Sequence, residues 1–418
     1  MKILMIDKYF FIKGGAERYY FELKDILESH GHQVIPFSMT HPRNFKTPFA
    51  GYFVRNIDYN PVTFFQKILV AFRSAGRIVY SFHAKRRLKA LIRVTKPDIA
   101  HLHMIDHQIS PSILHVLKRY QIPVVQTVHT YKHVCPTYRL YHMDKNVICE
   151  RCLNGAYYHA LSEKCHKGSN FATFLMVCEM TVHRLLGFYD RYVSRFLVPS
   201  HFMGKKMIQG GISPHQITHL FYTIDVDKYP HSYRSGDYFL YFGRLSAEKG
   251  LFTLLKAIQG TGAKLKIAGE GPERKALEAY AGTLKSEKVE FMGTVEGEAL
   301  WQLILNAQFV AVPSEWYENS PLVIYESLIM GKPVIGARIG GIPELIEHDI
   351  DGYLYQAENA GELRQCIHKL LNKKKKLKTM GKAGREKALQ MFHPDAHYEA
   401  LMRIYRHEIK LNLVKTAS

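Results

Sequence analysis

The sequence predicts an α/β protein made of two doubly wound domains that face each other across a cleft. Short apolar runs bounded by Pro, Gly or Asp alternate with helical patterns, which is typical of parallel sheets covered by helices. This alternation begins again near residue 237. The chain of 418 residues also exceeds the length at which a single hydrophobic core stops growing, so two domains are expected.

The first half is predicted to open with a strand, a glycine loop, a helix and a second strand. The expected elements are strand 2–6, loop 13–15, helix 16–29, and strands 33–37, 98–102, 123–128 and 196–199. Gly31 suits the end of the first helix, because glycine commonly follows the last helical residue. This half therefore has the strand and helix order of a parallel sheet.

The second half repeats the same alternation. The expected strands are 238–242, 264–268, 289–291, 309–313 and 333–337, and the expected helices are 251–258, 273–281, 298–306, one from 321, one from about 360 and one over 395–410. We expect a first domain over 1–222 with a Cys-rich insert at 135–165, a second domain over 223–391, and a helix over 392–418 that crosses back to the first domain. Open α/β sheets bind ligands at the carboxyl ends of their strands, so the cleft between the domains is the predicted site.

The charge of the chain is unevenly placed. Residues 1–200 carry 28 Lys and Arg against 13 Asp and Glu, a net +15, whereas residues 201–418 carry 29 against 24, a net +5. The first half is therefore expected to face an anionic partner or to expose a solvated basic surface. The sequence has no zinc-finger spacing with His ligands, no RNP-like aromatic motif and no basic zipper, so nucleic acid is not an expected partner. Because no uncharged apolar run reaches about 18 residues and the N-terminus turns polar at once, we expect a cytoplasmic protein.

The segment 315–326, EWYENSPLVIYE, places carboxylates in an apolar stretch. Ser320 and Pro321 predict the start of a helix, with the serine as the cap and the proline in the first helical position. A helix N-terminus attracts phosphate. Glu326 lies about 9 Å further along that helix, which suits a carboxylate that binds a ribose diol. Glu318, before the cap, lies beside the tip, where the rest of a sugar donor would be.

Two cations complement these carboxylates. Arg244 follows a predicted strand and Lys249 comes five residues later, so the pair is placed to clamp a diphosphate. The turn Gly269-Glu270-Gly271 and the pair Gly340-Gly341 allow the backbone to approach a ligand closely, because glycine has no Cβ.

Several motifs stand in a characteristic order. They are Gly14-Gly15-Ala16-Glu17, Gly243-Arg244, Glu248-Lys249-Gly250, Gly269-Glu270-Gly271-Pro272, Glu318-x7-Glu326, Gly331-Lys332-Pro333-Val334 and Gly340-Gly341-Ile342-Pro343-Glu344. This combination resembles the GT-B family of retaining, nucleotide-sugar-dependent glycosyltransferases, often called family four, and the resemblance covers nearly the whole chain. It implies two Rossmann-like domains and a UDP-, GDP- or ADP-linked sugar as the donor, with no cofactor required for catalysis.

The resemblance also implies roles for individual residues. Arg244 and Lys249 would hold the donor diphosphate, Glu326 would bind the ribose hydroxyls, and Glu318 would contact the transferred sugar. His129, at the end of strand 123–128, would reach that sugar from the acceptor domain. The remaining predicted donor-binding residues are Gly14, Gly15, Gly243, Gly269, Glu270, Gly271, Ser320, Pro321, Leu322 and Val323. We assign no side chain as a general base, since the leaving phosphate is expected to take the proton of the acceptor.

Four cysteines follow His129 with the spacing C-x13-C-x2-C-x12-C. They are Cys135, Cys149, Cys152 and Cys165. Disulfides are rare in a cytosolic chain, whereas four thiolates can hold a structural zinc ion tetrahedrally. The alternative is a set of uncoordinated cysteines in an acceptor loop.

The segment 61–96 mixes aromatic and aliphatic residues with a basic run over 85–89. The pattern is typical of a helix that lies on an anionic membrane, and equally of a core-packed helix with a solvated basic face. The family resemblance favours a lipid-linked acceptor, peripheral binding at the inner face of the membrane, and a role in the synthesis of cell-surface polysaccharide or glycolipid. The alternatives are an NAD-dependent oxidoreductase, although the first loop lacks Gly-x-Gly-x-x-Gly, and a non-catalytic membrane- or nucleic-acid-binding protein on the same scaffold.

Overall fold

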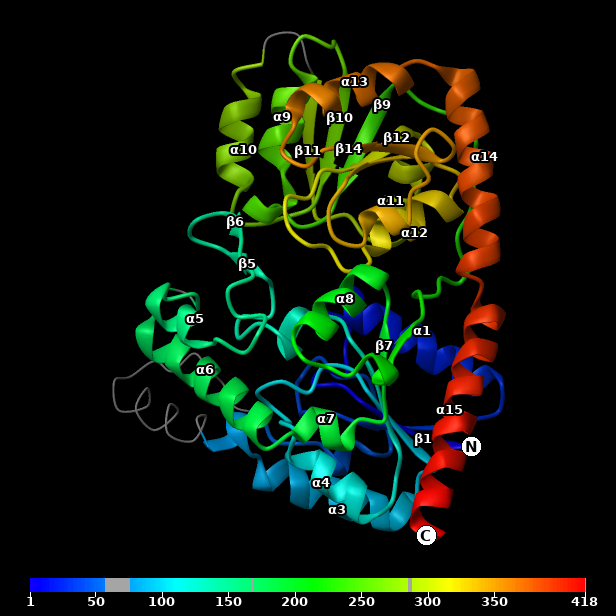
Figure 1. The fold of residues 1–418 in the computed structure, drawn as a ribbon. Coiled ribbons are helices and arrows are strands. Elements are labelled where there is room, and N and C mark those ends of the chain that lie inside the picture. Colours follow the sequence, from blue (N-terminus) through cyan, green and yellow to red (C-terminus); the bar gives the residue numbers. More distant parts are fainter. Residues whose placement is uncertain (57–75, 167, 285–287, 418) are drawn as a thin grey trace.

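The computed structural model describes residues 1–56, 76–166, 168–284 and 288–417. It contains two parallel six-stranded sheets, each with helices on its faces (Figure 1). The part of the molecule around the first sheet is called the first lobe, and the part around the second sheet the second lobe. The predicted fold class, two α/β domains across a cleft, is confirmed.

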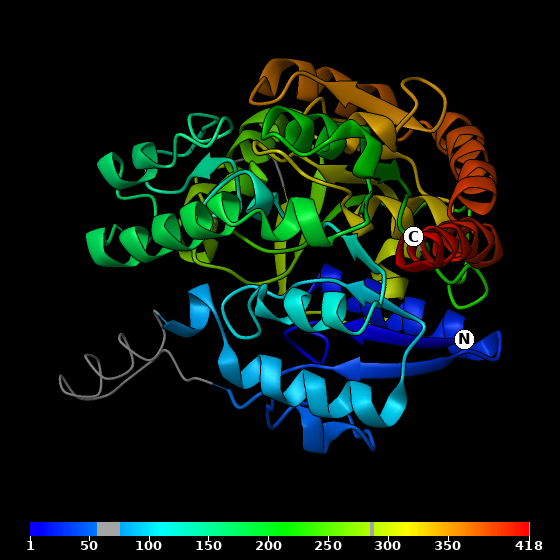
Figure 2. The ribbon, with the colours of Figure 1, turned by 60° about the horizontal axis from the view of Figure 1, so that its bottom comes forward.

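The first sheet has the strand order β2-β1-β3-β4-β7-β8, and its strands are parallel. The strands are β1 (Lys2–Ile6), β2 (Gln33–Phe37), β3 (Ile99–Leu102), β4 (Val124–Thr127), β7 (Arg195–Val198) and β8 (Ile217–His219). The helices of this lobe are α1 (Gly15–Ser29), α3 (Phe82–Thr95), α4 (Ser112–Arg119), α5 (Tyr158–Ser162), α6 (Asn170–Leu185), α7 (Phe188–Tyr192) and α8 (His201–Gln209). A hairpin of β5 (Tyr141–His142) and β6 (Val147–Ile148), together with α5 and α6, projects from one side of the lobe in both views (Figures 1 and 2).

The second sheet has the strand order β11-β10-β9-β12-β13-β14, again parallel. The strands are β9 (Tyr238–Phe242), β10 (Lys264–Ala268), β11 (Lys288–Gly293), β12 (Ala307–Val312), β13 (Val334–Ala337) and β14 (Gly352–Tyr355). The helices are α9 (Leu251–Ile258), α10 (Arg274–Ala281), α11 (Gly297–Leu305), α12 (Leu322–Ile329), α13 (Ala360–Leu370) and α14 (Lys374–Met391). Strands β9, β12, β13 and β14 are buried along their whole length, as expected for a sheet covered by helices on both faces.

The last helix, α15 (Pro394–Ala417), runs alongside the first lobe, whereas α14 before it runs alongside the second (Figure 1). Tyr405 of α15 bonds through its hydroxyl to Nδ1 of His101 on β3 at 2.6 Å. Glu408 of the same helix accepts from the guanidinium of Arg195 on β7, with 2.7 Å between Nη2 and Oε1. These side chains fix the end of the chain against the first sheet.

The segment predicted to lie on a membrane lies partly outside the described residues, which resume at residue 76. Its described part, α3, begins where the hydroxyl of Ser81 accepts a hydrogen bond from the backbone N–H of Ala84, as an N-cap does. The apolar side of α3, which includes Leu88, Leu91 and Ile92, is buried in the first lobe. This helix therefore follows the core-packed interpretation. In the described parts of the chain, no helix is long and apolar enough to cross a membrane.

Candidate functional site

A cavity of about 550 Å³ lies between the lobes and is lined by residues of both. Its size is within the usual range for small-molecule sites, about 300 to 1,000 Å³. Eleven of the predicted site residues line it: Gly15, His129, Gly243, Arg244, Lys249, Glu318, Ser320, Pro321, Leu322, Val323 and Glu326. The other four donor-site candidates, Gly14, Gly269, Glu270 and Gly271, are not among its lining residues.

Two helices begin at the cavity and point their N-termini into it. Helix α1 starts at Gly15 and helix α12 starts at Leu322. A Cβ on Gly15 would lie 3.4 Å from Cδ1 of Leu322, so the two tips meet across the cleft. The free N–H groups and dipoles at such tips favour an anion between them.

The predicted serine cap of α12 is wrong. Pro321 occupies the N-cap position with an extended backbone, and no side chain in the described part of the protein caps this helix. The hydroxyl of Ser320 instead bonds to the hydroxyl of Tyr325 at 2.6 Å. The backbone N–H groups at the tip of α12 therefore have no competing side-chain acceptor, which keeps them free for a ligand.

Glu326 is buried and forms an ion pair across the cleft. Nη2 of Arg18, on α1, lies 2.5 Å from Oε1 of Glu326. The hydroxyl of Tyr229 donates to the same oxygen at 3.4 Å. Since both donors use Oε1, the second oxygen of this carboxylate remains to accept from a ligand hydroxyl.

Glu318 is 6% exposed, and its Oε1 accepts from Nζ of Lys249 at 2.6 Å and from the hydroxyl of Ser314 at 2.7 Å. Burial alone would raise the pKa of Glu318, but the ammonium of Lys249 and these hydrogen bonds bring it below its ordinary value. Glu318 is therefore ionised at neutral pH, and it orients Lys249 in the cleft.

Arg244 follows β9 and is exposed to the cleft. Its backbone carbonyl accepts from the hydroxyl of Tyr241 at 2.7 Å, which holds the turn. Among the described residues, its guanidinium has no ion-pair partner. A free guanidinium at the mouth of the cavity is available to an anionic ligand.

His129 lines the cavity, but its two ring nitrogens bond to other residues of the chain. Nδ1 lies 2.7 Å from the hydroxyl of Tyr222, and Nε2 lies 3.0 Å from Nδ1 of His103. Burial lowers the pKa of His129 to about 3, so the imidazole is neutral. Both ring nitrogens of His129 are therefore occupied by contacts within the chain.

The turn Gly269-Glu270-Gly271 packs against the neighbouring strand end. A Cβ on Gly269 would lie 1.9 Å from the backbone oxygen of Gly243, and one on Gly271 would lie 2.1 Å from that of Leu245. Only glycine fits at these positions. The turn therefore supports the Gly243-Arg244 segment from behind.

The four cysteines do not support the predicted zinc site. All four are free thiols. Within the described residues, the only group of at least three metal-ligating side chains whose ligand atoms approach within 4.8 Å is His201, His219 and Glu344.

Three contributors to the site were not predicted from sequence: Arg18, Tyr229 and Tyr222. Arg18 stands directly after the Gly14-Gly15-Ala16-Glu17 motif, so a search for cations near the first glycine loop would have found it. The two tyrosines lie beside or within the irregular segment before β9, and no spacing rule relates them to the cleft.

Family models match both halves of the chain. A model described as "Glycosyltransferase Family 4" matches residues 13–228, more than half of the chain. A model described as "Glycosyl transferases group 1" matches residues 228–387.

Curated relatives and solved structures agree with these matches. The chain is 29% identical over 221 residues to the sulfoquinovosyl transferase SQD2 of Arabidopsis thaliana, which covers 48% of this chain and 42% of the plant protein. It is 26% identical over 291 residues to an uncharacterized glycosyltransferase of Methanocaldococcus jannaschii, and this match covers 68% of this chain and 68% of the other protein.

Two structures show the likeness of fold across whole chains. Sucrose-phosphate synthase from Thermosynechococcus elongatus superposes with a TM-score of 0.69 at 17% identity, covering 100% of both chains. Anabaena HepE in complex with UDP and glucose superposes with a TM-score of 0.62 at 18% identity, covering 97% of this chain and 100% of the other. The chain belongs to glycosyltransferase family 4, a family of retaining glycosyltransferases that use nucleotide sugars.

Proposed function

We propose that the protein transfers a sugar from a nucleotide diphosphate sugar, with retention, to an acceptor bound on the first lobe, in the synthesis of a cell-surface polysaccharide or glycolipid. The observation that carries the donor part is the arrangement of Glu326, Glu318, Lys249 and Arg244 around one interlobe cavity. It combines acceptors for hydroxyl groups with cations for a diphosphate in a single site.

The proposed donor lies with its diphosphate between the tips of α1 and α12. Arg244 and Lys249 face this position, and the ribose reaches Glu326. As the bond from the sugar to the diphosphate breaks, negative charge grows on the leaving phosphate, and these fixed cations and helix tips stabilise it. The leaving phosphate then accepts the proton of the acceptor hydroxyl.

A membrane-bound acceptor is the proposed partner of the first lobe. Supporting observations are the net charge of +15 over residues 1–200 and three exposed apolar side chains on α6, Phe171, Phe174 and Leu185. Basic and apolar surface together favour adsorption to anionic lipid. The test is sedimentation with anionic vesicles at low salt. Protein that stays in the supernatant would refute membrane binding.

The donor is tested with a panel of UDP-, GDP- and ADP-sugars in thermal-shift and calorimetric titrations. One nucleotide should raise Tm and bind with a 1:1 stoichiometry. UDP is the first to try, because the structurally similar Anabaena protein was crystallised with it. If none of the three nucleotide classes binds, the proposed donor site is wrong.

Replacing Glu326 with Gln should weaken binding of the matching nucleotide about tenfold or more, because a hydrogen bond to a charged acceptor contributes about 1.5 to 3 kcal/mol. Isothermal titration against the same nucleotide measures the effect. The exposed Glu386 provides the matched control, and Glu386→Gln should bind like the unmodified protein. An unchanged dissociation constant in Glu326→Gln would remove its proposed ribose role.

A further inference from the structure

A second cluster of ligating side chains lies at the seam between the lobes, and it is the group of His201, His219 and Glu344. His201 is the first residue of α8, and His219 ends β8, so both belong to the first lobe. Glu344 ends the short 3-10 helix η5 (Ile342–Glu344), which follows β13 of the second lobe. One nitrogen from each ring and one carboxylate oxygen lie within 4.8 Å of one another.

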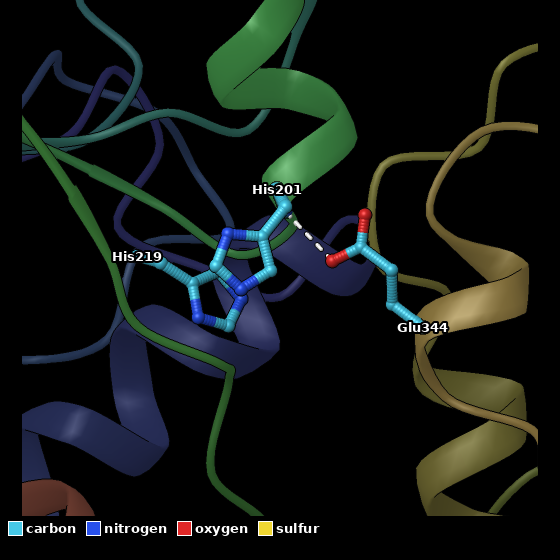
Figure 3. A group of neighbouring side chains, drawn as sticks. All are labelled: His201, His219 and Glu344. Atoms are coloured by element: carbon cyan, nitrogen blue, oxygen red, sulfur yellow. Dashed lines mark hydrogen bonds between the residues drawn. The ribbon is translucent and has the colours of Figure 1, made fainter. Parts of the chain in front are cut away.

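The three side chains lie next to one another, with the carboxylate of Glu344 facing the start of α8 (Figure 3). The imidazoles of His201 and His219 are stacked, with 3.9 Å between ring centroids and 20° between their planes. The carboxylate of Glu344 accepts from the backbone N–H groups of His201 and Phe202, each at 2.7 Å. Each carboxylate oxygen has two lone pairs, so both oxygens retain acceptor capacity after these bonds.

The imidazole of His219 has an unused nitrogen. Its Nε2 is buried and has no hydrogen-bond partner among the residues that the structure describes. A buried polar atom without a partner is uncommon in folded proteins, and an ion at the site is one of its recognised causes.

The ligand chemistry selects the kind of ion. Two imidazoles and one carboxylate are a donor set that Zn²⁺ accepts, with water in the fourth position. Imidazole also suits Ni²⁺ and Cu²⁺, whereas Ca²⁺ and Mg²⁺ require oxygen ligands. Ligand atoms around tetrahedral zinc are roughly 3.3 Å apart, given bonds of about 2 Å. The exposed ring of His201 can tilt to close this gap.

We propose that His201, His219 and Glu344 bind one divalent transition-metal ion of the Zn²⁺ type, and that this ion links the two lobes. The loop before η5 connects this proposed ion site to the donor cavity. Gly341 in that loop donates its backbone N–H to the backbone oxygen of Glu318 at 2.8 Å. A bound ion therefore restrains the loop that carries Glu318, and this metal role is separate from the proposed transfer reaction.

The test is titration of the metal-free, full-length chain with Zn²⁺ by calorimetry, in parallel with the variants His201→Gln, His219→Gln and His215→Gln. His215 is exposed on the same lobe and controls for adventitious binding by the 23 histidines. We expect the unmodified protein and His215→Gln to bind one equivalent of Zn²⁺ with equal affinity. His201→Gln and His219→Gln should bind Zn²⁺ at least tenfold more weakly.

Co²⁺ separates this site from the cysteines. The proposed site gives only the d–d bands of nitrogen and oxygen ligands, whereas binding to thiolates adds intense sulfur-to-metal charge transfer. Bound Zn²⁺ should also raise the Tm of the protein and of His215→Gln, but not that of His201→Gln. If His219→Gln does not fold, the comparison of His201→Gln with the unmodified protein is sufficient, because His201 is exposed. Equal Zn²⁺ affinity in His201→Gln and the unmodified protein, or a Co²⁺ spectrum of thiolate ligands alone, would overturn the proposal.

Discussion

The contact between Arg18 and Glu326 joins residues that are 308 positions apart. Glu326 is 3% exposed, and a buried carboxylate is stable only when it is paired and hydrogen-bonded. Arg18 provides the charge and Tyr229 provides a second donor. The proposed ribose ligand of the second lobe is thus oriented by a cation of the first lobe, so the donor site is complete only when the lobes are together.

Replacing Arg18 with Met should weaken nucleotide binding about tenfold, because Glu326 loses the cation that pairs with it and orients its carboxylate. The nucleotide dissociation constant is measured for Arg18→Met, for Glu326→Gln and for the double variant, which together form a double-mutant cycle. Arg403 is exposed, so Arg403→Met is the control. Contacting residues couple by about 0.5 to 3 kcal/mol. Strictly additive effects of the two substitutions would show that Arg18 does not act through Glu326.

At the scale of elements, the turn that carries Lys249 depends on one glycine. Gly250 has a φ of +68° and follows the 3-10 helix η4 (Ala247–Lys249) directly before α9. A Cβ at this position would lie 1.9 Å from the backbone oxygen of Pro313. Both the left-handed backbone and this close approach to the end of β12 therefore require glycine, and together they fix where Lys249 enters the cleft.

Gly250→Ala should lower stability by more than the roughly 1–2 kcal/mol of left-handed strain alone, and it should weaken nucleotide binding by displacing Lys249. Gly262 is the matched control, because its φ is +66° and a Cβ there would meet nothing within 4 Å. Urea unfolding gives the free energy of unfolding of both variants. The additional loss in Gly250→Ala over Gly262→Ala measures the steric clash with Pro313, because both variants share the left-handed backbone strain. Equal losses of unfolding free energy would mean that the contact with Pro313 is unimportant.

At the scale of the whole molecule, α15 joins the end of the chain to a buried row of imidazoles in the first lobe. His101 bonds to Tyr405 through Nδ1 and to the hydroxyl of Thr127 through Nε2, at 2.6 and 2.7 Å. Its ring stacks on His103, which stacks on His129 at the cavity. The docking of α15 therefore supports the wall of the donor cleft from behind.

Tyr405→Phe removes the hydroxyl and leaves Nδ1 of His101 buried without a partner. We expect the unfolding free energy to fall by about 1–3 kcal/mol, as measured by urea denaturation at pH 7. Tyr192→Phe is the control, because the hydroxyl of Tyr192 has no hydrogen bond to the described residues. Equal stability of Tyr405→Phe and the unmodified protein would show that this bond contributes nothing to docking.

The same histidine predicts a pH dependence of stability. Burial is the largest cause that lowers the pKa of His101 to about 3 from 6.5. Between those two values the unfolded chain binds the extra proton, so the contribution of His101 is present above pH 6.5 and is lost as pH falls toward 3. At pH 5 the loss is about 2 kcal/mol, from 1.36 kcal/mol per pH unit.

This pH effect is measured as the difference in unfolding free energy between pH 7 and pH 5. In His101→Gln the difference should be smaller by about 2 kcal/mol than in the unmodified protein, because the variant has nothing to protonate at this position. Identical pH profiles for the two proteins would contradict a neutral His101 in the folded state.

The sequence by itself determined the two parallel sheets and the chemical class of the protein. Strand and helix periodicity are local properties, and so is the spacing of Glu318 and Glu326 within one loop and helix. The short strands β8 and β14 and the helix α14 were missed. Strand β8 spans only three residues, and the basic run at the start of α14 hides its apolar face.

Only the tertiary structure decided which of these residues meet. The ion pair of Arg18 and Glu326 and the group of His201, His219 and Glu344 each join the two lobes. The predicted zinc site is not supported, because among the described residues no three sulfurs lie within 4.8 Å of one another. In each case the distance depends on how separate elements pack, and no local pattern encodes that packing.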